Sequence, residues 1–207
     1  MSKCMKVLFF VDTHGSSSKL RKIIEKAKDV DLLVCGGDFT IFEDNMRKIL
    51  FELNSIKKPI LIIHGNHETA SSVKDECEQL ENLYFIHKTY YITNNLIFYG
   101  YGGGGFSTRD EKFTHDSEDF VKELNNLSSK NNKKYELVLI THGPAYGTNT
   151  DYLFDEHVGN KSIRDFIIKH SPILAMSGHI HETAGTEDKL HKTRVINPGW
   201  DGMIIDL

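Results

Sequence analysis

Five apolar runs of the sequence each end in residues that can bind metal ions. The five endings are Asp12-Thr13-His14, Gly37-Asp38, Gly65-Asn66-His67-Glu68, His142-Gly143-Pro144 and Gly178-His179-Ile180-His181. In α/β sheets, ligands bind beyond the carboxyl ends of the strands, so five such endings can share one site. Carboxylate, amide and imidazole groups together suit divalent transition metals. The sequence therefore indicates a metal site with oxygen and nitrogen ligands.

The spacing within these endings is compatible with more than one ion. Residues i and i+2 of an extended segment point to the same side, so Asp12 and His14 could reach one ion together. If the chain bends at the glycine before them, His179 and His181 could instead serve two neighbouring ions. The carboxylate of Asp38 has two oxygens and could bridge two cations.

A structural interpretation of the same residues is also available. Asp12, Asp38 and Asn66 belong to the residue types that are commonest in turns and at helix caps. Any one of them alone would fit that role. Their occurrence in order, together with histidines, favours the metal site.

The elements that must position these residues alternate along the first part of the chain. MKVLFFVDTHG, DLLVCGGD and KPILIIHGNHE read as strands, and SSSKLRKIIEKAKD and NMRKILFELNSI between them read as helices. This alternation predicts a βαβαβ unit with a parallel sheet. From Leu83 the pattern indicates two or three short strands with a turn at Asn94-Asn95.

The second part of the chain repeats strands and helices. SEDFVKELNNLSSK and NKSIRDFIIKH read as helices, YELVLITHG and PILAMSGHIH as buried strands, and TRVINPGWDGMIIDL as two strands around a turn. We expect a single domain over residues 1–207. Its expected fold class is α/β, with two packed mixed β-sheets flanked by helices in an α/β/β/α four-layer sandwich.

Composition restricts the partners. The chain has 207 residues, 39% of them hydrophobic, and a net charge of −4, so no stable nucleic-acid complex held by phosphate contacts is expected. Three scattered cysteines form a poor disulfide framework and favour reduced thiols. The VLFFV run is too short for a signal segment or a membrane span, so we expect a cytoplasmic protein that does not enter a membrane. Its oligomeric state is left open.

The ordered series DTH, GGD, GNHE, THG and GHIH resembles the calcineurin-like metallophosphoesterase superfamily. The pattern of that superfamily is Asp-x-His, Gly-Asp, Gly-Asn-His-Asp/Glu, His and Gly-His-x-His, and this chain carries all five motifs in that order. The stretches THGPAYGTNTD, EHVGNKSIRDFI and TRVINPG resemble its small single-domain branch. The resemblance implies two divalent transition-metal ions, with manganese favoured and iron, zinc, nickel or cobalt left open.

The resemblance also implies a role for each matching residue. One ion would be held by Asp12, His14 and His181, the other by Asn66, His142 and His179, with Asp38 bridging them. His67 would face the phosphate without binding metal. A hydroxide shared by the two ions would attack phosphorus, and His67 would offset the developing charge or protonate the leaving alkoxide. Glu68 could orient that region.

We expect a metal-dependent phosphoric ester hydrolase, with a phosphodiesterase acting on a small nucleotide or other phosphodiester favoured over a monoesterase. Protein phosphatases of the superfamily carry an arginine soon after Gly-Asp and another after Gly-Asn-His. Here GGDFTIFEDN and GNHETAS contain none, which disfavours a phosphoprotein substrate. Two alternatives stay open: a non-catalytic scaffold on the same fold, and a nuclease subunit, although the DNA-repair nucleases of the superfamily are longer.

Two further features fall outside the five motifs. The resemblance also implies that the glycines of Gly100–Gly105 lie near the rim of the metal pocket, either as amides offered to substrate or as a turn that clears space. His157 is expected either to line the pocket or to start a helix. His64 is expected to be a partly buried structural residue, and the histidines at 87, 115, 170 and 191 to be surface or cap residues.

Overall fold

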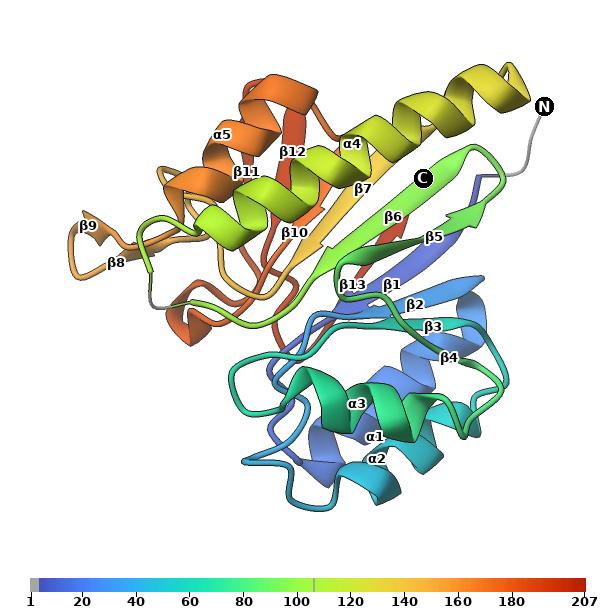
Figure 1. The fold of residues 1–207 in the computed structure, drawn as a ribbon. Helices are drawn as coiled ribbons and strands as arrows, with labels where there is room; N and C mark the ends of the chain where they lie inside the picture. The colour runs from blue at the N-terminus through green and yellow to red at the C-terminus, as the bar shows by residue number, and fades with distance from the viewer. Residues whose placement is uncertain (1–3, 106) are drawn as a thin grey trace.

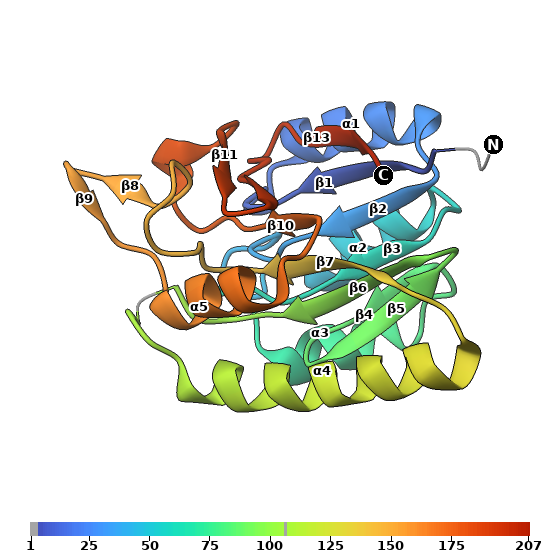
Figure 2. The same cartoon turned by 90° about the horizontal axis from the view of Figure 1, so that it is seen from above.

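The computed structural model describes residues 4–105 and 107–207, which form two large β-sheets with helices on their outer faces (Figures 1 and 2). The α/β/β/α arrangement predicted from the sequence is therefore confirmed. Figure 1 shows α1, α2 and α3 on the outer face of one sheet, and α4 and α5 on the outer face of the other. The two sheets pack face to face between these helical layers.

The first sheet has the strand order β13-β1-β2-β3-β4. Its strands are β1 (Lys6–Phe10), β2 (Leu32–Cys35), β3 (Ile60–Ile62), β4 (Leu83–Phe85) and β13 (Met203–Asp206). The first four run parallel, and β13 pairs with β1 antiparallel, with Lys6 opposite Asp206. Parallel strands buried on both faces read as continuous apolar runs, which is why the LLVC segment of β2 is apolar throughout.

The second sheet has the order β11-β12-β10-β7-β6-β5. Its strands are β5 (Thr89–Thr93), β6 (Leu96–Tyr101), β7 (Glu136–Thr141), β10 (Leu174–Met176), β11 (Glu187–Leu190) and β12 (Thr193–Ile196). The four central strands are parallel, and the two edge strands are antiparallel to their neighbours. The turn predicted at Asn94-Asn95 joins β5 to β6, with Asn94 in the left-handed conformation at a φ of 54°.

Five helices cover the sheets: α1 (Ser17–Lys26), α2 (Met46–Asn54), α3 (Ala70–Cys77), α4 (Glu111–Asn131) and α5 (Lys161–His170). Two short 3-10 turns, η1 (Ala27–Asp29) and η2 (His181–Thr183), follow α1 and β10. Four of the helices begin at a side chain that accepts a backbone N–H of the first turn: Ser16, Thr69, Asp110 and Asn160. Such caps each stabilise a helix by about 0.5–2 kcal/mol. No helix of the described residues combines the length and apolar character needed to cross a membrane.

Three apolar layers hold the sandwich together. The central layer lies between the two sheets and includes Phe9, Phe98, Ile140 and Met176. The outer layers lie between each sheet and its helices, with Leu50 in one of them. Burying a large apolar side chain completely contributes about 1.5–3 kcal/mol, so these layers fix how the strand ends of one sheet face those of the other.

Three local features differ from expectation. The two strands expected in the last segment exist, but β12 and β13 lie in different sheets, because the segment between them crosses over and Gly199 accepts a hydrogen bond from Val11 N–H at 3.1 Å. Helix α4 begins at Glu111, earlier than expected, because Asp110 caps it. Helix α3 and the small hairpin of β8 (Tyr152–Leu153) and β9 (Glu156–His157) were not predicted.

Candidate metal centre

The carboxyl ends of five strands bring the predicted metal-binding residues together. The first sheet supplies Asp12, His14, Asp38 and Asn66 after β1, β2 and β3, and the second supplies His142, His179 and His181 after β7 and β10. Three groups of acidic and imidazole side chains there have ligand atoms within 4.8 Å of one another. The site therefore lies across the boundary between the two sheets.

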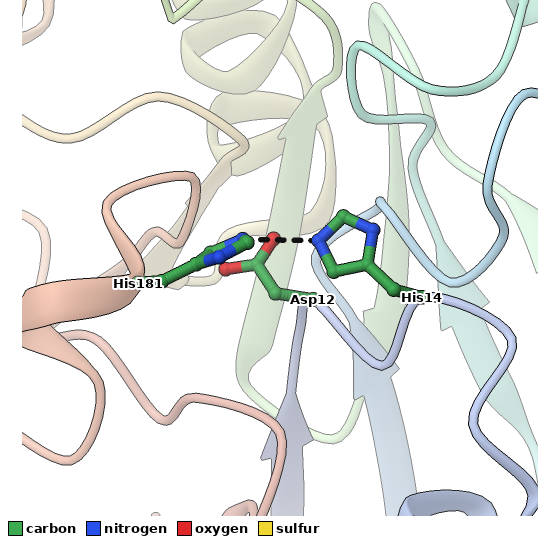
Figure 3. A group of neighbouring side chains, drawn as sticks. All are labelled: Asp12, His14 and His181. Atoms are coloured by element: carbon green, nitrogen blue, oxygen red, sulfur yellow. Dashed lines mark hydrogen bonds between the residues drawn. The ribbon is translucent and has the colours of Figure 1, made fainter.

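The first group consists of Asp12, His14 and His181 (Figure 3). The Nε2 atoms of His14 and His181 face each other at 2.9 Å, and His14 Nδ1 donates to the carbonyl of Thr40. Asp12 Oδ2 accepts the backbone N–H of His179, whereas buried Oδ1 has no hydrogen-bond partner among the described residues. Burial raises the pKa of Asp12 to about 6. A cation here would satisfy that oxygen and take the place of the proton shared by the two rings.

The other two groups share Asp38, which lies with His14 and His67 in one and with His142 and His179 in the other. The side-chain oxygen of Asn66 joins His142 and His179 in a second cluster. It lies 3.0 Å from His142 Nε2 and 2.9 Å from His179 Nδ1. His142 is fully buried, and its Nδ1 donates to the carbonyl of Gly36 at 2.9 Å. Both ring nitrogens of His142 therefore face oxygen acceptors, which requires either a second proton or a cation at Nε2. The donor set fits a divalent metal ion.

Asp38 lies between the first group and the cluster of Asn66, His142 and His179. Its Oδ2 is 3.4 Å from His142 Nε2 and 4.0 Å from both His14 Nε2 and His67 Nε2. Burial alone would raise the pKa of Asp38, but the hydrogen bond and charge of His142 and the backbone N–H of His67 lower it to about 2. Asp38 is thus a carboxylate with one oxygen directed at residues of both groups.

The backbone of this site is strained. The φ angles of Asp12, His14, Asp38 and His179 are 56°, 46°, 48° and 68°, in the left-handed region that residues other than glycine rarely adopt. Each costs about 1–2 kcal/mol, and such strain is concentrated at functional sites. Asp12 and His14 therefore do meet, but by a left-handed turn and not because an extended segment points both side chains one way.

Glu68 supports the segments that carry the ligands. Its buried carboxylate accepts four hydrogen bonds: at Oε2 from the N–H groups of Asp38 (3.0 Å) and Gly65 (2.9 Å), and at Oε1 from the N–H (2.8 Å) and hydroxyl (2.7 Å) of Thr40. The close approach requires glycine, because a Cβ on Gly65 would lie 2.0 Å from Asp38 Oδ1. The orienting role considered for Glu68 thus has a physical basis in this network.

A row of aromatic rings crosses the site. The ring centroids of His67 and His14 are 4.9 Å apart, and those of His14 and His181 are 4.8 Å apart. Phe42 continues the row beyond His67 at 4.7 Å, and Trp200 continues it beyond His181 at 6.2 Å. No sequence pattern singles out Phe42 or Trp200, since neither residue lies in one of the five motifs.

The glycine-rich stretch after β6 lies beside the site, as expected from the sequence. A Cβ on Gly105 would lie 2.5 Å from His179 Nε2, and one on Gly103 would lie 2.8 Å from the His64 ring. By contrast, a Cβ on Gly104 would meet no atom of the described residues within 4 Å. Phe106, inside the stretch YGYGGGGFS, lies outside the described residues. The stretch therefore packs closely against the site at Gly105, and its backbone is open at Gly104.

Other histidines have different surroundings. His157 lies on the β8–β9 hairpin, where its Nδ1 is 2.8 Å from buried Asp151, and it belongs to none of the three groups of possible ligands. His64 is half-buried as expected, and its Nδ1 donates to the Gly65 carbonyl. The expectation that His87 is a surface or cap residue was wrong: the ring is half-buried beneath the glycine-rich stretch, and its Nδ1 accepts the N–H of Gly102 at 2.8 Å.

The comparison with known families now identifies the chain. Residues 5–183 match the model of the calcineurin-like phosphoesterase family. The protein belongs to this family. It is therefore a member of a family of metal-dependent phosphoric ester hydrolases, as the sequence motifs indicate. No curated protein matches the sequence.

Solved structures share the fold of this phosphoesterase at low sequence identity. The protein TT1561 of Thermus thermophilus has a TM-score of 0.74 and 16% identity, over 95% of this chain and 90% of its own. A dimetal phosphatase from Danio rerio has a TM-score of 0.61 and 12% identity, over 92% and 86%. GAP50, described as the anchor in the inner membrane complex of Plasmodium, has a TM-score of 0.62 and 12% identity, over 96% and 72%.

Proposed function

We propose that this phosphoesterase is a dinuclear phosphodiesterase that hydrolyses a small nucleotide or another small phosphodiester. The observation that carries the proposal is the position of the Asp38 carboxylate between two groups of metal-binding side chains. A carboxylate shared in this way suits two cations. The similarity of fold to a dimetal phosphatase supports the same count of ions.

Seven residues would hold the ions: Asp12, His14 and His181 the first, Asn66, His142 and His179 the second, and Asp38 both. The unpartnered oxygen of Asp12 and the two acceptors facing His142 support this assignment. Manganese is our preferred metal, and iron, zinc, nickel and cobalt suit the same mixed ligands. When bound, such ions act as Lewis acids and lower the pKa of water towards neutrality.

His67 is the residue that we assign to proton transfer and to the substrate. Its backbone N–H donates to Asp38 Oδ1 at 2.9 Å, which holds the side chain beside the ligands, and its Nε2 lies 4.0 Å from Asp38 Oδ2. The ring is partly open to solvent. From this position Nε2 can donate a hydrogen bond to a phosphoryl oxygen and a proton to the departing alkoxide.

The charges near the site favour a diester over a phosphoprotein. Arg47, the first arginine after the Gly-Asp motif, lies on α2 and pairs with Glu76 at 3.8 Å. Lys19 touches the site, where it donates to the carbonyl of Asp12 at 3.2 Å while covering the ring of Trp200. A diester carries a single negative charge and needs fewer cationic side chains than a dianionic monoester.

The test is a panel of phosphomonoesters, phosphodiesters and cyclic nucleotides, including bis(p-nitrophenyl) phosphate, assayed with several divalent metals. We expect metal-dependent diester hydrolysis, with H67A reduced by about 100-fold or more because general acid catalysis contributes about that much. D38N should lose both metal and activity. H115A is the matched control, since His115 is an exposed histidine of α4 with 77% of its side chain accessible.

If the metal-loaded protein hydrolyses nothing in this panel, the enzymatic proposal is wrong. The alternative is then a scaffold, which is supported by the occurrence of the same fold in a protein described as an anchor. Binding of metal without turnover, together with capture of a partner, would favour it. A nuclease subunit would instead show DNA binding that falls steeply with salt.

The free thiols of Cys4, Cys35 and Cys77 support a reducing location such as the cytoplasm.

A further inference from the structure

Phe42 is a strained and exposed aromatic residue at the edge of the site. Its φ angle is 48°, in the left-handed region, and 79% of its surface is accessible to solvent. A bulky side chain in this conformation is an outlier, and exposing a phenylalanine forgoes the stabilisation that its burial would give. Phe154 is equally strained and exposed, so the neighbours of Phe42, and not its strain alone, decide what the residue does.

The loop that carries Phe42 is firmly anchored. Thr40, before it, is bonded to Glu68 through both its N–H and its hydroxyl. Glu43, after it, accepts the N–H of Thr69 at 2.7 Å and the hydroxyl of Ser72 at 3.2 Å, both at the start of α3. The N–H of Glu43 in turn donates to the Thr40 hydroxyl at 3.1 Å. The backbone on both sides of Phe42 is therefore held by the same network that positions Asp38.

The ring of Phe42 lies beside the residue that we assign to the leaving group. Its centroid is 4.7 Å from that of His67, with 41° between the ring planes, and His67 Nε2 is 4.0 Å from Asp38 Oδ2. A phosphate at the metal-binding residues would have one of its ester groups directed past His67 towards Phe42. That ester group would meet an open, flat, apolar surface.

We propose that Phe42 is a specificity-determining residue that stacks against the nucleobase of a nucleotide ester. The inference rests on the proposed phosphodiesterase function and names the substrate class. The exposed ring offers a flat face to a planar π system, with exposed Ile41 and the polar residues Glu43 and Asn45 as its neighbours. In a nucleotide the sugar separates the base from the phosphate by about one ring, and aromatic side chains stack on any base with little sequence preference.

The first experiment measures binding without turnover. Wild-type protein loaded with Mn²⁺ is titrated with adenosine 5′-monophosphate and with ribose 5-phosphate, which carries a hydroxyl in place of the base. We expect the nucleotide to bind at least about fivefold more tightly, the lower limit for stacking of a base on an aromatic side chain. In F42L this preference should disappear, and in F42Y it should remain.

The matched control is F154L. Phe154 is also exposed, at 87%, and has nearly the same backbone conformation, with a φ of 49°, but it lies on the β8–β9 connection. F154L should keep the full preference for the nucleotide. An equal preference in wild type and F42L, or its loss in F154L as well, would overturn the assignment of Phe42. Circular dichroism confirms that the variants are folded, and retention in F42Y shows that the ring and not the position matters.

The second experiment separates this inference from the proposed function. Hydrolysis of the methyl ester of adenosine 5′-monophosphate is compared with that of the methyl ester of ribose 5-phosphate. If F42L lowers kcat/KM for the first at least about fivefold and leaves the second unchanged, Phe42 recognises the base. If both esters are hydrolysed and F42L affects them equally, stacking is wrong while the phosphodiesterase proposal stands. If neither is hydrolysed by any metal-loaded form, the phosphodiesterase proposal fails for nucleotide esters, and the binding titration alone decides on stacking.

Discussion

Replacing the buried carboxylate Glu68 by glutamine should weaken both the fold and the metal site. In the wild type each carboxylate oxygen of Glu68 accepts two hydrogen bonds. The glutamine keeps one of these oxygens and replaces the other by an NH₂ group, which faces the donors of that second oxygen. The better of its two orientations places NH₂ at the Oε1 position, where the hydroxyl of Thr40 can rotate and accept but the backbone N–H of Thr40 cannot. At least one buried N–H therefore loses its partner.

The loss of stability in E68Q follows from the number of buried N–H groups that lose their acceptor. One unsatisfied buried donor costs about 1–3 kcal/mol, and the remaining hydrogen bonds lose the extra strength of an ionised acceptor. We expect E68Q to lower the free energy of unfolding by about 2–3 kcal/mol. Since Glu68 also holds the N–H groups of Asp38 and Gly65, metal affinity should fall by about 10–100-fold, the usual effect of losing a group that orients ligands.

Trp200 provides the signal for the assay. It is the one tryptophan of the sequence, and its ring is 6.2 Å from that of His181, so urea unfolding and metal titration can both be followed by its fluorescence. The control is E43Q, in which Glu43 also accepts a backbone N–H but lies near solvent and keeps an oxygen for Thr69. It should change stability by less than about 0.5 kcal/mol.

Two results would refute the reasoning about Glu68. If E68Q unfolds within about 0.5 kcal/mol of the wild type, its hydrogen bonds do not stabilise the fold by the amount inferred. If E68Q is destabilised but binds metal as tightly as the wild type, the network supports the chain without positioning the ligands.

Lys58 donates to the carbonyls of residues 27, 28 and 30 at 2.6–2.8 Å, so K58M should lower the free energy of unfolding in urea by about 2 kcal/mol, whereas K57M at the exposed neighbour should not. Burial, followed by the charge of His64, lowers the pKa of His87 from 6.5 to about 4. The unfolded chain therefore binds more protons there between those pH values, and wild type should lose about 2 kcal/mol more than H87N as the pH falls through that window, after allowance for partial exposure. A parallel decline of both proteins would exclude His87 as the cause. F42G relieves a left-handed backbone and should raise the unfolding free energy by about 0.5–1 kcal/mol; a loss of more than about 1 kcal/mol would mean that the ring packs against the fold.

The layer order and the convergence of the strand ends could be predicted because they depend on local patterns. Apolar runs that stop at Asp12, Asp38 or Asn66 mark both the strand and its end. Once the strands are parallel, their ends meet at one edge of a sheet, so the ligand residues that follow β1, β2 and β3 must approach one another. Their meeting with His142, His179 and His181 depends in addition on how the two sheets pack.

The features that were missed depend on such contacts. The pairing of β13 with β1 joins segments at opposite ends of the chain, and a short MIID strand does not specify its partner. The left-handed conformations of Asp12 and His14 are imposed by the surrounding structure, because these residue types strongly prefer extended or right-handed conformations. The burial of His87 depends on the path of the glycine-rich stretch above it.

The position of the metal-binding residues across two sheets has a consequence for the whole sandwich. Because Asp12 and His14 follow one sheet and His181 follows the other, a bound ion would add a cross-link between two halves that already adhere through apolar contacts and a few hydrogen bonds, such as that of His142 Nδ1 to the Gly36 carbonyl. The resistance of the protein to heat would then vary with the concentration of free metal. A cavity would affect this cross-link differently in the two kinds of apolar layer. A cavity beside Met176, between the sheets, would loosen the cross-link, whereas a cavity beside Leu50, under the helices, would leave it intact.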